Sequence, residues 1–266
     1  MPAVSAIDSE SDSKENDACT IYCAEKEIFT KFPSDKNTPE DLKKAEELRA
    51  EIEAQNEKEI TVSVDKYAGE QLLTSSTVTL GTDATFTSAD SGDSGTSSWG
   101  AAPNFKGSDY SASSKKARET AVTGPAGYGG CGAWAWVGKS FTVLGSGSQS
   151  ANIRMSGHIY GLTSAAAGGS SSSNVDLVLK DLTTGTSYSI SIYSKSCGGL
   201  GWETVDQNYN KGLSITLQSG HDYIAYLKIS GSSSTYGAGE AGSDFGPWDL
   251  DDDGECVTYS SIVINF

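Results

Sequence analysis

This chain of 266 residues contains little arginine and little histidine. Arginine occurs only at Arg49, Arg118 and Arg154, and the formal net charge is -16, from 35 acidic and 19 basic residues. A surface of this sign repels both the phosphates of nucleic acids and anionic membrane lipids. We therefore expect neither nucleic acid nor an anionic membrane surface among its partners.

Long apolar runs are missing as well. No stretch approaches the roughly 20 apolar residues that a membrane-spanning helix needs. The first residues, Met1–Asp8, lack the charged and apolar segments of a secretory signal peptide. Glycine, serine and threonine dominate the composition, as in many exported surface proteins. We therefore expect an extracellular or cell-surface protein whose leader is absent from this sequence.

Cysteine is scarce and odd in number, at Cys19, Cys23, Cys131, Cys197 and Cys256. An odd count leaves at least one thiol unpaired or paired between chains. Zinc is disfavoured because no Cys-x-x-Cys is present and the chain has only two histidines. A disulfide among the last three cysteines would suit an oxidising compartment, and the sequence does not fix the pairing.

The sequence divides into three parts by composition. Residues 1–59 are acidic and partly helical, residues 60–130 are rich in Ser and Gly with one to three strands, and residues 131–266 carry the strongest strand signal. A helix is expected from Thr38, as N-cap, to about Gln55. The alternation of Ile60–Val64 predicts a strand after it.

The C-terminal part predicts a β-sandwich. Six segments alternate between apolar and polar residues: Phe141–Val143, Ile153–Met155, Val175–Leu179, Tyr188–Ile192, Leu213–Leu217 and Tyr223–Ile229. Turns are expected between them at Asp181–Gly185 and Gln218–His221. Short strands with no helix between them favour a mainly β fold: an antiparallel sandwich, jelly-roll or immunoglobulin-like, with an N-terminal helical segment.

The last segment changes phase. Val257 and Tyr259 share one parity, whereas Ile262 and Ile264 share the other. A β-bulge adds one residue to a strand and so reverses the side of every residue that follows. We therefore predict a bulge near Ser260, which would place all four side chains on one face.

Several of these segments carry a family resemblance. Phe141–Val143, Asn174–Asp181, Leu213–Leu217 and Ser219–Tyr223 are similar in order and pattern to the secreted pre-peptidase C-terminal-like sandwiches and to carbohydrate-binding jelly rolls of bacterial and archaeal proteins. The Gly-rich stretch Tyr236–Gly246 is similar to segments of archaeal surface proteins. The resemblance covers about the C-terminal half, and it implies export and a non-catalytic role without naming a ligand.

An acidic run near the C-terminus predicts a calcium site. Asp249, Asp251 and Asp253 alternate before Gly254, as at positions 1, 3 and 5 of a calcium loop. Glu255 would add its backbone carbonyl, and Asp244 would fold back to complete the oxygen ligands. Position 12 of the run is a serine, and a strand follows, so the loop is not an EF-hand. The alternative is an acidic surface turn without metal.

Four tryptophans are candidate sugar-binding residues: Trp134, Trp136, Trp202 and Trp248. Exposed aromatic rings stack on the apolar faces of sugars, while neighbouring acids and amides bind the hydroxyl groups. Trp134 and Trp136 are two residues apart and so share one face of a strand. The alternative for this pair is that both fill the protein core.

The composition and motifs together favour a non-enzymatic structural or adhesive protein of the cell surface, with a calcium-stiffened loop. Self-association is possible if a strand, either the last one or Ile60–Val64, is donated to a neighbouring chain. The alternative function is a carbohydrate-binding module that uses its tryptophans on a surface polysaccharide. We expect no enzymatic activity, since no Gly-x-Ser-x-Gly or phosphate-binding loop is present.

Overall fold

A computed structural model describes residues 38–71, 76–125, 127–246 and 255–266. Within them the chain is mainly β, with one long helix and two sheets, which confirms the predicted fold class. The helix is α2 (Pro39–Gln71). No helix in the described part of the chain is long and apolar enough to cross a membrane.

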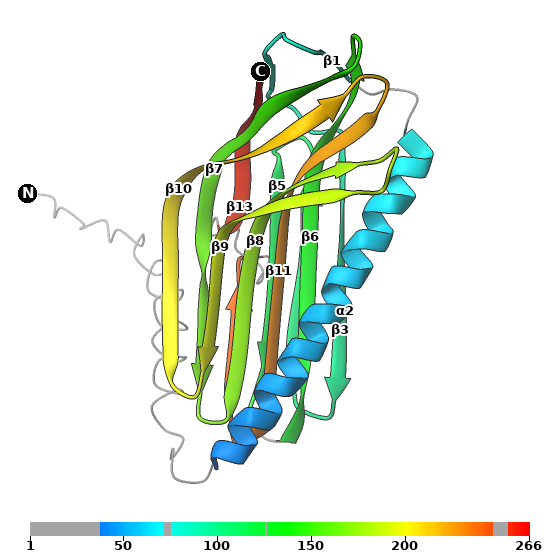
Figure 1. Cartoon of the computed structure of the whole chain (residues 1–266). Coiled ribbons are helices and arrows are strands. Elements are labelled where there is room, and N and C mark those ends of the chain that lie inside the picture. The colour runs from blue at the N-terminus through cyan, green and yellow to red at the C-terminus, as the bar shows by residue number, and fades with distance from the viewer. Residues whose placement is uncertain (1–37, 72–75, 126, 247–254) are drawn as a thin grey trace, which may run out of the picture. The chain divides into compact units, whose positions relative to one another are not determined.

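The strands form two sheets that face each other (Figure 1). In the described residues, sheet A has the order β1-β6-β11-β8-β9, with β3 also paired to β6. Its strands are β1 (Ser76–Thr79), β3 (Ser91–Gly100), β6 (Gly127–Leu144), β8 (Gly169–Asp181), β9 (Ser187–Gly198) and β11 (Asp222–Gly237). All of its pairings are antiparallel except the one between β1 and β6.

Sheet B has the order β10-β7-β12-β5-β13-β2 in the described residues, with β4 paired to β5 and β13 also paired to β7. Its strands are β2 (Ala84–Phe86), β4 (Asn104–Ser111), β5 (Lys116–Thr123), β7 (Ser148–Ala166), β10 (Gly201–Gln218), β12 (Glu240–Asp244) and β13 (Cys256–Asn265). All six predicted strand segments of the C-terminal part lie inside strands of one sheet or the other.

The predicted turns and bulge are present. Gly185 and Gly220 take positive φ angles of 77° and 83° in the turns that follow β8 and β10. The pairing of β13 with β7 shifts by one residue between Tyr259 and Ser261, which confirms the bulge. Val257 and Ile262, on opposite sides of the shift, are therefore both fully buried in the core between the sheets.

The Ser/Gly-rich region contributes more to the sandwich than its composition indicates. Strands β1 to β5 all lie within it, more than the one to three predicted. β1, β2, β3 and β5 pair with β6, β12 or β13, whereas β4 pairs with β5. β6 begins at Gly127 and crosses the boundary expected between residues 130 and 131. Both sheets are thus built from strands on either side of that boundary.

The predicted strand Ile60–Val64 is wrong, because this segment is helical. α2 begins as expected, with Thr38 Oγ1 accepting a hydrogen bond from the Asp41 backbone N–H at 3.2 Å, but it continues to Gln71. Ile60 and Val64 are four residues apart and lie buried on one side of the helix, whereas Val62 is 61% exposed. Alternation and helical spacing coincide at positions i and i+4, so apolar residues at 60 and 64 fit both patterns.

The helix covers the outer face of sheet A (Figure 1). Its buried stripe runs along its whole length: Ala45, Leu48, Ile52, Asn56, Ile60, Val64 and Tyr67. At 1.5 Å per residue, 33 helical residues extend over about 50 Å, so one helix spans most of the sheet. The strands beneath it are therefore buried on both sides.

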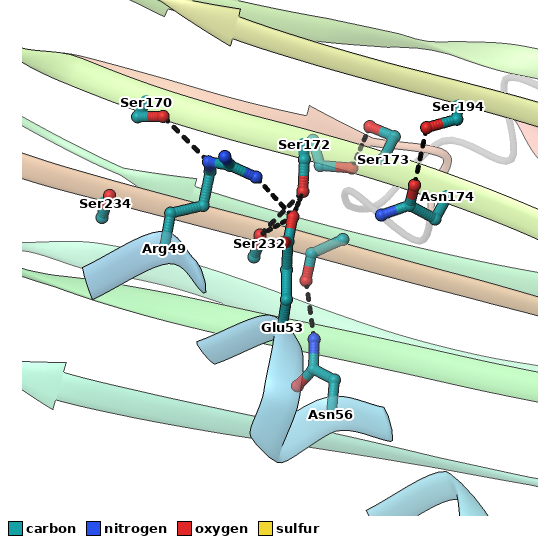
Figure 2. A network of polar contacts seen from close by, with 12 residues as sticks. Arg49, Glu53, Asn56, Ser170, Ser172, Ser173, Asn174, Ser194, Ser232 and Ser234 are labelled. Carbon is teal, nitrogen blue, oxygen red and sulfur yellow. Dashed lines mark hydrogen bonds and ion pairs between the residues drawn. The ribbon is translucent and has the colours of Figure 1, made fainter. Parts of the chain in front are cut away.

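Polar contacts join the first half of the helix to serines of β8 and β11 (Figure 2). Arg49 Nε donates to Ser170 Oγ at 2.9 Å, and Arg49 also pairs with Glu53 at 2.5 Å. Glu53 in turn accepts from the hydroxyl of Ser172. Asn56 Nδ2 donates to the Gly231 carbonyl at 3.0 Å. These bonds fix the first half of the helix on a part of sheet A that is built mainly of serine and glycine.

The space between the sheets changes character along the strands. One region holds large apolar side chains such as Phe141, Ile153 and Tyr223. The other holds small and polar ones, in which Ser243 donates to Glu119 Oε1 at 2.5 Å and Ser173 bonds Ser243 at 2.6 Å. Glu119 is fully buried there, and burial raises the pKa of its carboxyl group to about 8.

Candidate functional site

The outer face of sheet B carries the described aromatic side chain that best fits a ligand-binding role. Residues of β10 alternate between the core, as with Val205 and Tyr209, and the outside. Trp202 belongs to the outward set and is 62% exposed. A tryptophan of this exposure on a strand presents a large ring from a rigid element, which suits binding better than a ring on a flexible loop.

The strand register places Trp202 in a row with a second exposed aromatic residue. Across the sheet, Trp202 is opposite Ser164, which is opposite Gly242. Gly242 is opposite Val122, and Val122 is opposite Phe105 on β4. Directly paired residues point to the same side of a sheet. The Trp202–Phe105 row therefore has aromatic residues at its two ends, and Phe105 is 44% exposed.

The residues between the two aromatics are small. Ser164 and Gly242 present almost no side chain to the outside, and Val122 is half-buried. A Cβ atom on Gly242 would lie 3.1 Å from Val122 Cγ2 and 3.6 Å from Ser164 Oγ. A larger residue at this position would therefore stand above its neighbours in the middle of the row.

Polar side chains continue along β10 and β7 on the same face. His158 Nε2 lies 2.9 Å from Asp206 Oδ1. Arg154 donates from Nη2 to Asn210 Oδ1 at 3.1 Å. Asn208, between Asp206 and Asn210 in the outward set, is exposed. Amides, a carboxylate, an imidazole and a guanidinium thus follow each other along the strand pair, and the contacts between neighbours hold them in place.

The predicted tryptophans separate into three groups. Trp134 and Trp136 share one face, as predicted, but they lie under α2 with exposed fractions of 5% and 0%. Trp134 Nε1 donates to Glu59 and Trp136 Nε1 to Ser63, each at 2.9 Å. A sugar-binding role for this pair is therefore excluded in the described state, and both serve the core. Trp202 is exposed as described above.

The fourth tryptophan and most of the predicted calcium loop lie outside the described residues: Trp248, Asp249, Asp251 and Asp253. Asp244 closes β12, where its Oδ1 accepts from Thr120 Oγ1 at 2.9 Å and from the Gly246 backbone N–H at 3.1 Å. Glu255 immediately precedes β13. The described residues alone contain no group of three metal-ligating side chains. The calcium site stays a prediction.

Asp244 and Trp202 are brought onto the same face. Asp244 is opposite Leu162, and Leu162 is opposite Thr204 on β10. The row that contains Asp244 is therefore adjacent to the Trp202–Phe105 row. The sequence predicted both residues but gave no reason to connect them, because they are 42 positions apart and meet only through β7.

The expectation of a disulfide among the last three cysteines is wrong. Cys131, Cys197 and Cys256 lie on β6, β9 and β13, and they do not pair with one another. Cys131 Sγ lies against hydroxyl groups instead, 3.4 Å from Ser233 Oγ. Burial raises the pKa of the Cys131 thiol, so it behaves as a small core residue. Cys19 and Cys23 lie outside the described residues.

The sequence did not identify Phe105 or the polar residues of β10 as candidates. A signal was present in β10, where the polar residues Thr204, Asp206, Asn208 and Asn210 share one parity and the apolar residues Val205 and Tyr209 share the other. No such signal existed for Phe105, because its neighbours are polar and its importance depends entirely on the register of β4 with β5.

Comparisons with known proteins give no family. No family model matches the sequence, and no curated protein matches it. The resemblance to pre-peptidase C-terminal-like domains therefore stays a prediction, and only its coarser content, the β-sandwich, is confirmed.

Three solved structures are similar over part of their length. An isomalto-dextranase of Arthrobacter globiformis complexed with panose shares 16% identity over 65% of this chain and 23% of its own, with a TM-score of 0.21. The enzymatically active domain of tailspike protein 4 from bacteriophage CBA120 shares 10% identity over 63% of this chain and 19% of its own length, with a TM-score of 0.18. The CBM22-1–GH10 modules of a Clostridium thermocellum xylanase complexed with xylohexaose share 10% identity over 63% of this chain and 30% of their own length, with a TM-score of 0.16. The chain thus spans less than a third of each, and we draw nothing about function from these likenesses.

Proposed function

We propose that this chain is a non-catalytic module of an exported or cell-surface protein, and that it binds polysaccharide on the outer face of sheet B. The observation that carries the proposal is the Trp202–Phe105 row, in which two exposed aromatic residues flank small ones on a rigid sheet. A flat aromatic ring and a sugar ring associate through their apolar faces.

Polar residues farther along β10, about 13 to 26 Å from Trp202 at about 3.3 Å per residue, supply the second requirement for sugar recognition. Asp206, Asn208 and Asn210 are exposed on the same face as Trp202. Amides and carboxylates donate to and accept from hydroxyl groups, which are the dominant polar groups of a polysaccharide. Because His158 and Arg154 hold two of these side chains, little rotamer entropy is lost when a ligand binds.

Binding without catalysis is proposed because the acidic side chains here are engaged in holding the face together. Asp206 pairs with His158, and Asp244 accepts from Thr120 and from the Gly246 backbone. Glycoside hydrolysis needs two carboxyl groups on opposite sides of a bound sugar, one of them able to donate a proton. Carboxylates lying in one sheet surface serve instead to orient hydroxyl groups.

Strand exchange is not carried into the proposal. β13 pairs with β7 from Cys256 to Asn265, and with β5 and β2 at its two ends. Donation of this strand to a neighbour would break all three ladders and expose a core strand. The adhesive role remains, since a module that binds surface polysaccharide attaches its protein to that surface. A calcium-bound loop between Asp244 and Glu255 would stiffen the connection between β12 and β13.

The test is affinity electrophoresis of the whole chain in gels containing soluble polysaccharides, beginning with dextran, hydroxyethyl cellulose and xylan. We expect retardation by at least one of them, and at least a tenfold weaker affinity for Trp202→Ala, the scale of an aromatic contact worth about 1.5 kcal/mol or more. Leu200→Ala is the matched control, because Leu200 is 72% exposed two residues away. Equal loss in both variants, or no retardation by any polysaccharide, would contradict the proposal.

A further inference from the structure

The Trp202–Phe105 row indicates which class of polysaccharide this face takes. Resting on the proposed function, we infer that the ligand is an uncharged glycan chain that crosses the strands from Trp202 to Phe105. Neither an anionic polysaccharide nor a single terminal sugar fits the row as well, for reasons of length, height and charge.

Length is the first reason. Trp202 and Phe105 are separated by four steps between neighbouring strands, through β7, β12 and β5. At about 4.8 Å per step the two residues are about 19 Å apart. One sugar ring covers only a fraction of this distance, whereas a short run of linked rings reaches both aromatics. The two contacts are then made by one chain, and the second contact is made at a high effective concentration.

Height is the second reason. Gly242 lies at the centre of the row, and Ser164 beside it is only 7% exposed. A chain that contacts both aromatics must pass over this centre, where only backbone and small side chains stand. A Cβ at position 242 would already lie close to Val122. The further atoms of a β-branched residue would therefore extend outward, into the path of the glycan.

Charge is the third reason. Glu240 and Asp244 share the parity of Gly242 and lie on either side of it along β12. The described outward residues of the row, and of the next row from Thr204 to Gly107, include no lysine or arginine. Carboxylate or sulfate groups of an anionic glycan would lie close to these two acidic residues, whereas hydroxyl groups of a neutral glycan can donate to carboxylates.

The experiment compares two pairs of polymers with the same backbone, in the same gel system at low salt. The pairs are dextran with dextran sulfate, and hydroxyethyl cellulose with carboxymethyl cellulose. We expect the neutral member of at least one pair to bind at least tenfold more tightly than its charged counterpart. Binding as tight or tighter to a charged member would overturn the inference and leave the proposed function standing, provided that Trp202→Ala still weakens it. Absence of binding to these four polymers and to xylan would overturn both.

The path of the chain is tested with neutral oligosaccharides of increasing length taken from the polymer that binds. The affinity of the wild type should rise with oligosaccharide length until the ligand reaches both aromatic residues. Phe105→Ala should bind the long oligosaccharides at least tenfold more weakly than the wild type, and the shortest binding oligosaccharide with unchanged affinity. Gly242→Val should weaken the long oligosaccharides in the same way. Tyr188→Ala, at an exposed tyrosine of sheet A, is the control. A length gain that survives in Phe105→Ala would refute the crossing path. If Gly242→Val melts at a lower temperature than the wild type, Phe105→Ala alone decides.

Discussion

Glu119 lies in the polar region between the sheets, and its protonation should govern how stability depends on pH. Its carboxyl group is fully buried, Oε1 accepts from Ser243, and Oε2 has no hydrogen-bond partner among the described residues. Burial is the largest reason why its pKa rises from the usual 4.5 to about 8, with the nearby charge of Asp244 adding to it. The group is therefore neutral in the folded protein at pH 7.

The direction of the effect follows from proton linkage. Between pH 4.5 and about 8 the unfolded chain has released this proton and the folded chain has not. The unfolded state then binds fewer protons, so the free energy of unfolding falls as pH rises through this window. Each pH unit corresponds to about 1.4 kcal/mol, so the window from 4.5 to about 8 corresponds to about 5 kcal/mol of lost stability.

The variant Glu119→Gln removes the titration and keeps an oxygen that can accept from Ser243. We expect its unfolding free energy, from urea titrations at pH 5 to 9, to lose about 4 kcal/mol less than that of the wild type over this range. Glu51→Gln, at an exposed helix position, should follow the wild-type curve. Parallel curves for the wild type and Glu119→Gln would refute the idea that Glu119 holds a proton in the folded state.

Three further predictions follow, two on packing and one on metal binding. Gly231→Ala should destabilise the fold by about 1–3 kcal/mol in urea titrations, because a Cβ there would overlap the Glu119 carboxyl group, and Glu119→Ala should relieve most of this loss in the double variant. Trp136→Ala should destabilise by about 3–5 kcal/mol, measured in the same way, because a fully buried indole ring is removed from beneath α2. If the predicted loop binds calcium, millimolar calcium should raise the melting temperature of the wild type in differential scanning fluorimetry, and Asp251→Asn with Asp253→Asn should abolish the rise; an unchanged wild-type melting temperature would contradict the site.

Alternation was a sound guide where a strand has one buried face and a sufficient number of apolar residues. It located β7 to β11, and the change of phase between Val257 and Ile262 was enough to predict the bulge in β13. It failed at β3, whose sequence is mostly serine and glycine. The reason is tertiary: a Cβ on Gly95 would overlap the Trp134 ring, so this strand is built to admit a neighbour's side chain.

The site could be predicted only in part, because the sequence shows neither which face the helix covers nor how the strands of sheet B are ordered. Trp134 and Trp136 were correctly placed on one face of a strand, but nothing local to them indicates that a helix more than 60 residues earlier covers that face. Trp202 was a candidate from the start, yet its partner Phe105 follows only from the order of five strands. The sequence therefore identified residues with suitable side chains, and the register of the strands determined which of them lie in one row.

The small and polar region between the sheets gives the binding face its support. Ser243 and Thr163 flank Gly242 and Ser164 in sequence and point the other way, into the interior. There Thr163 bonds Ser173, and Ser173 bonds Ser243, each at 2.6 Å. Hydroxyl groups that bond across the interior hold the backbone of the Trp202–Phe105 row from behind, without a bulky core. A ligand that rests on backbone and small side chains needs such support, because those positions have no large side chains of their own to resist displacement.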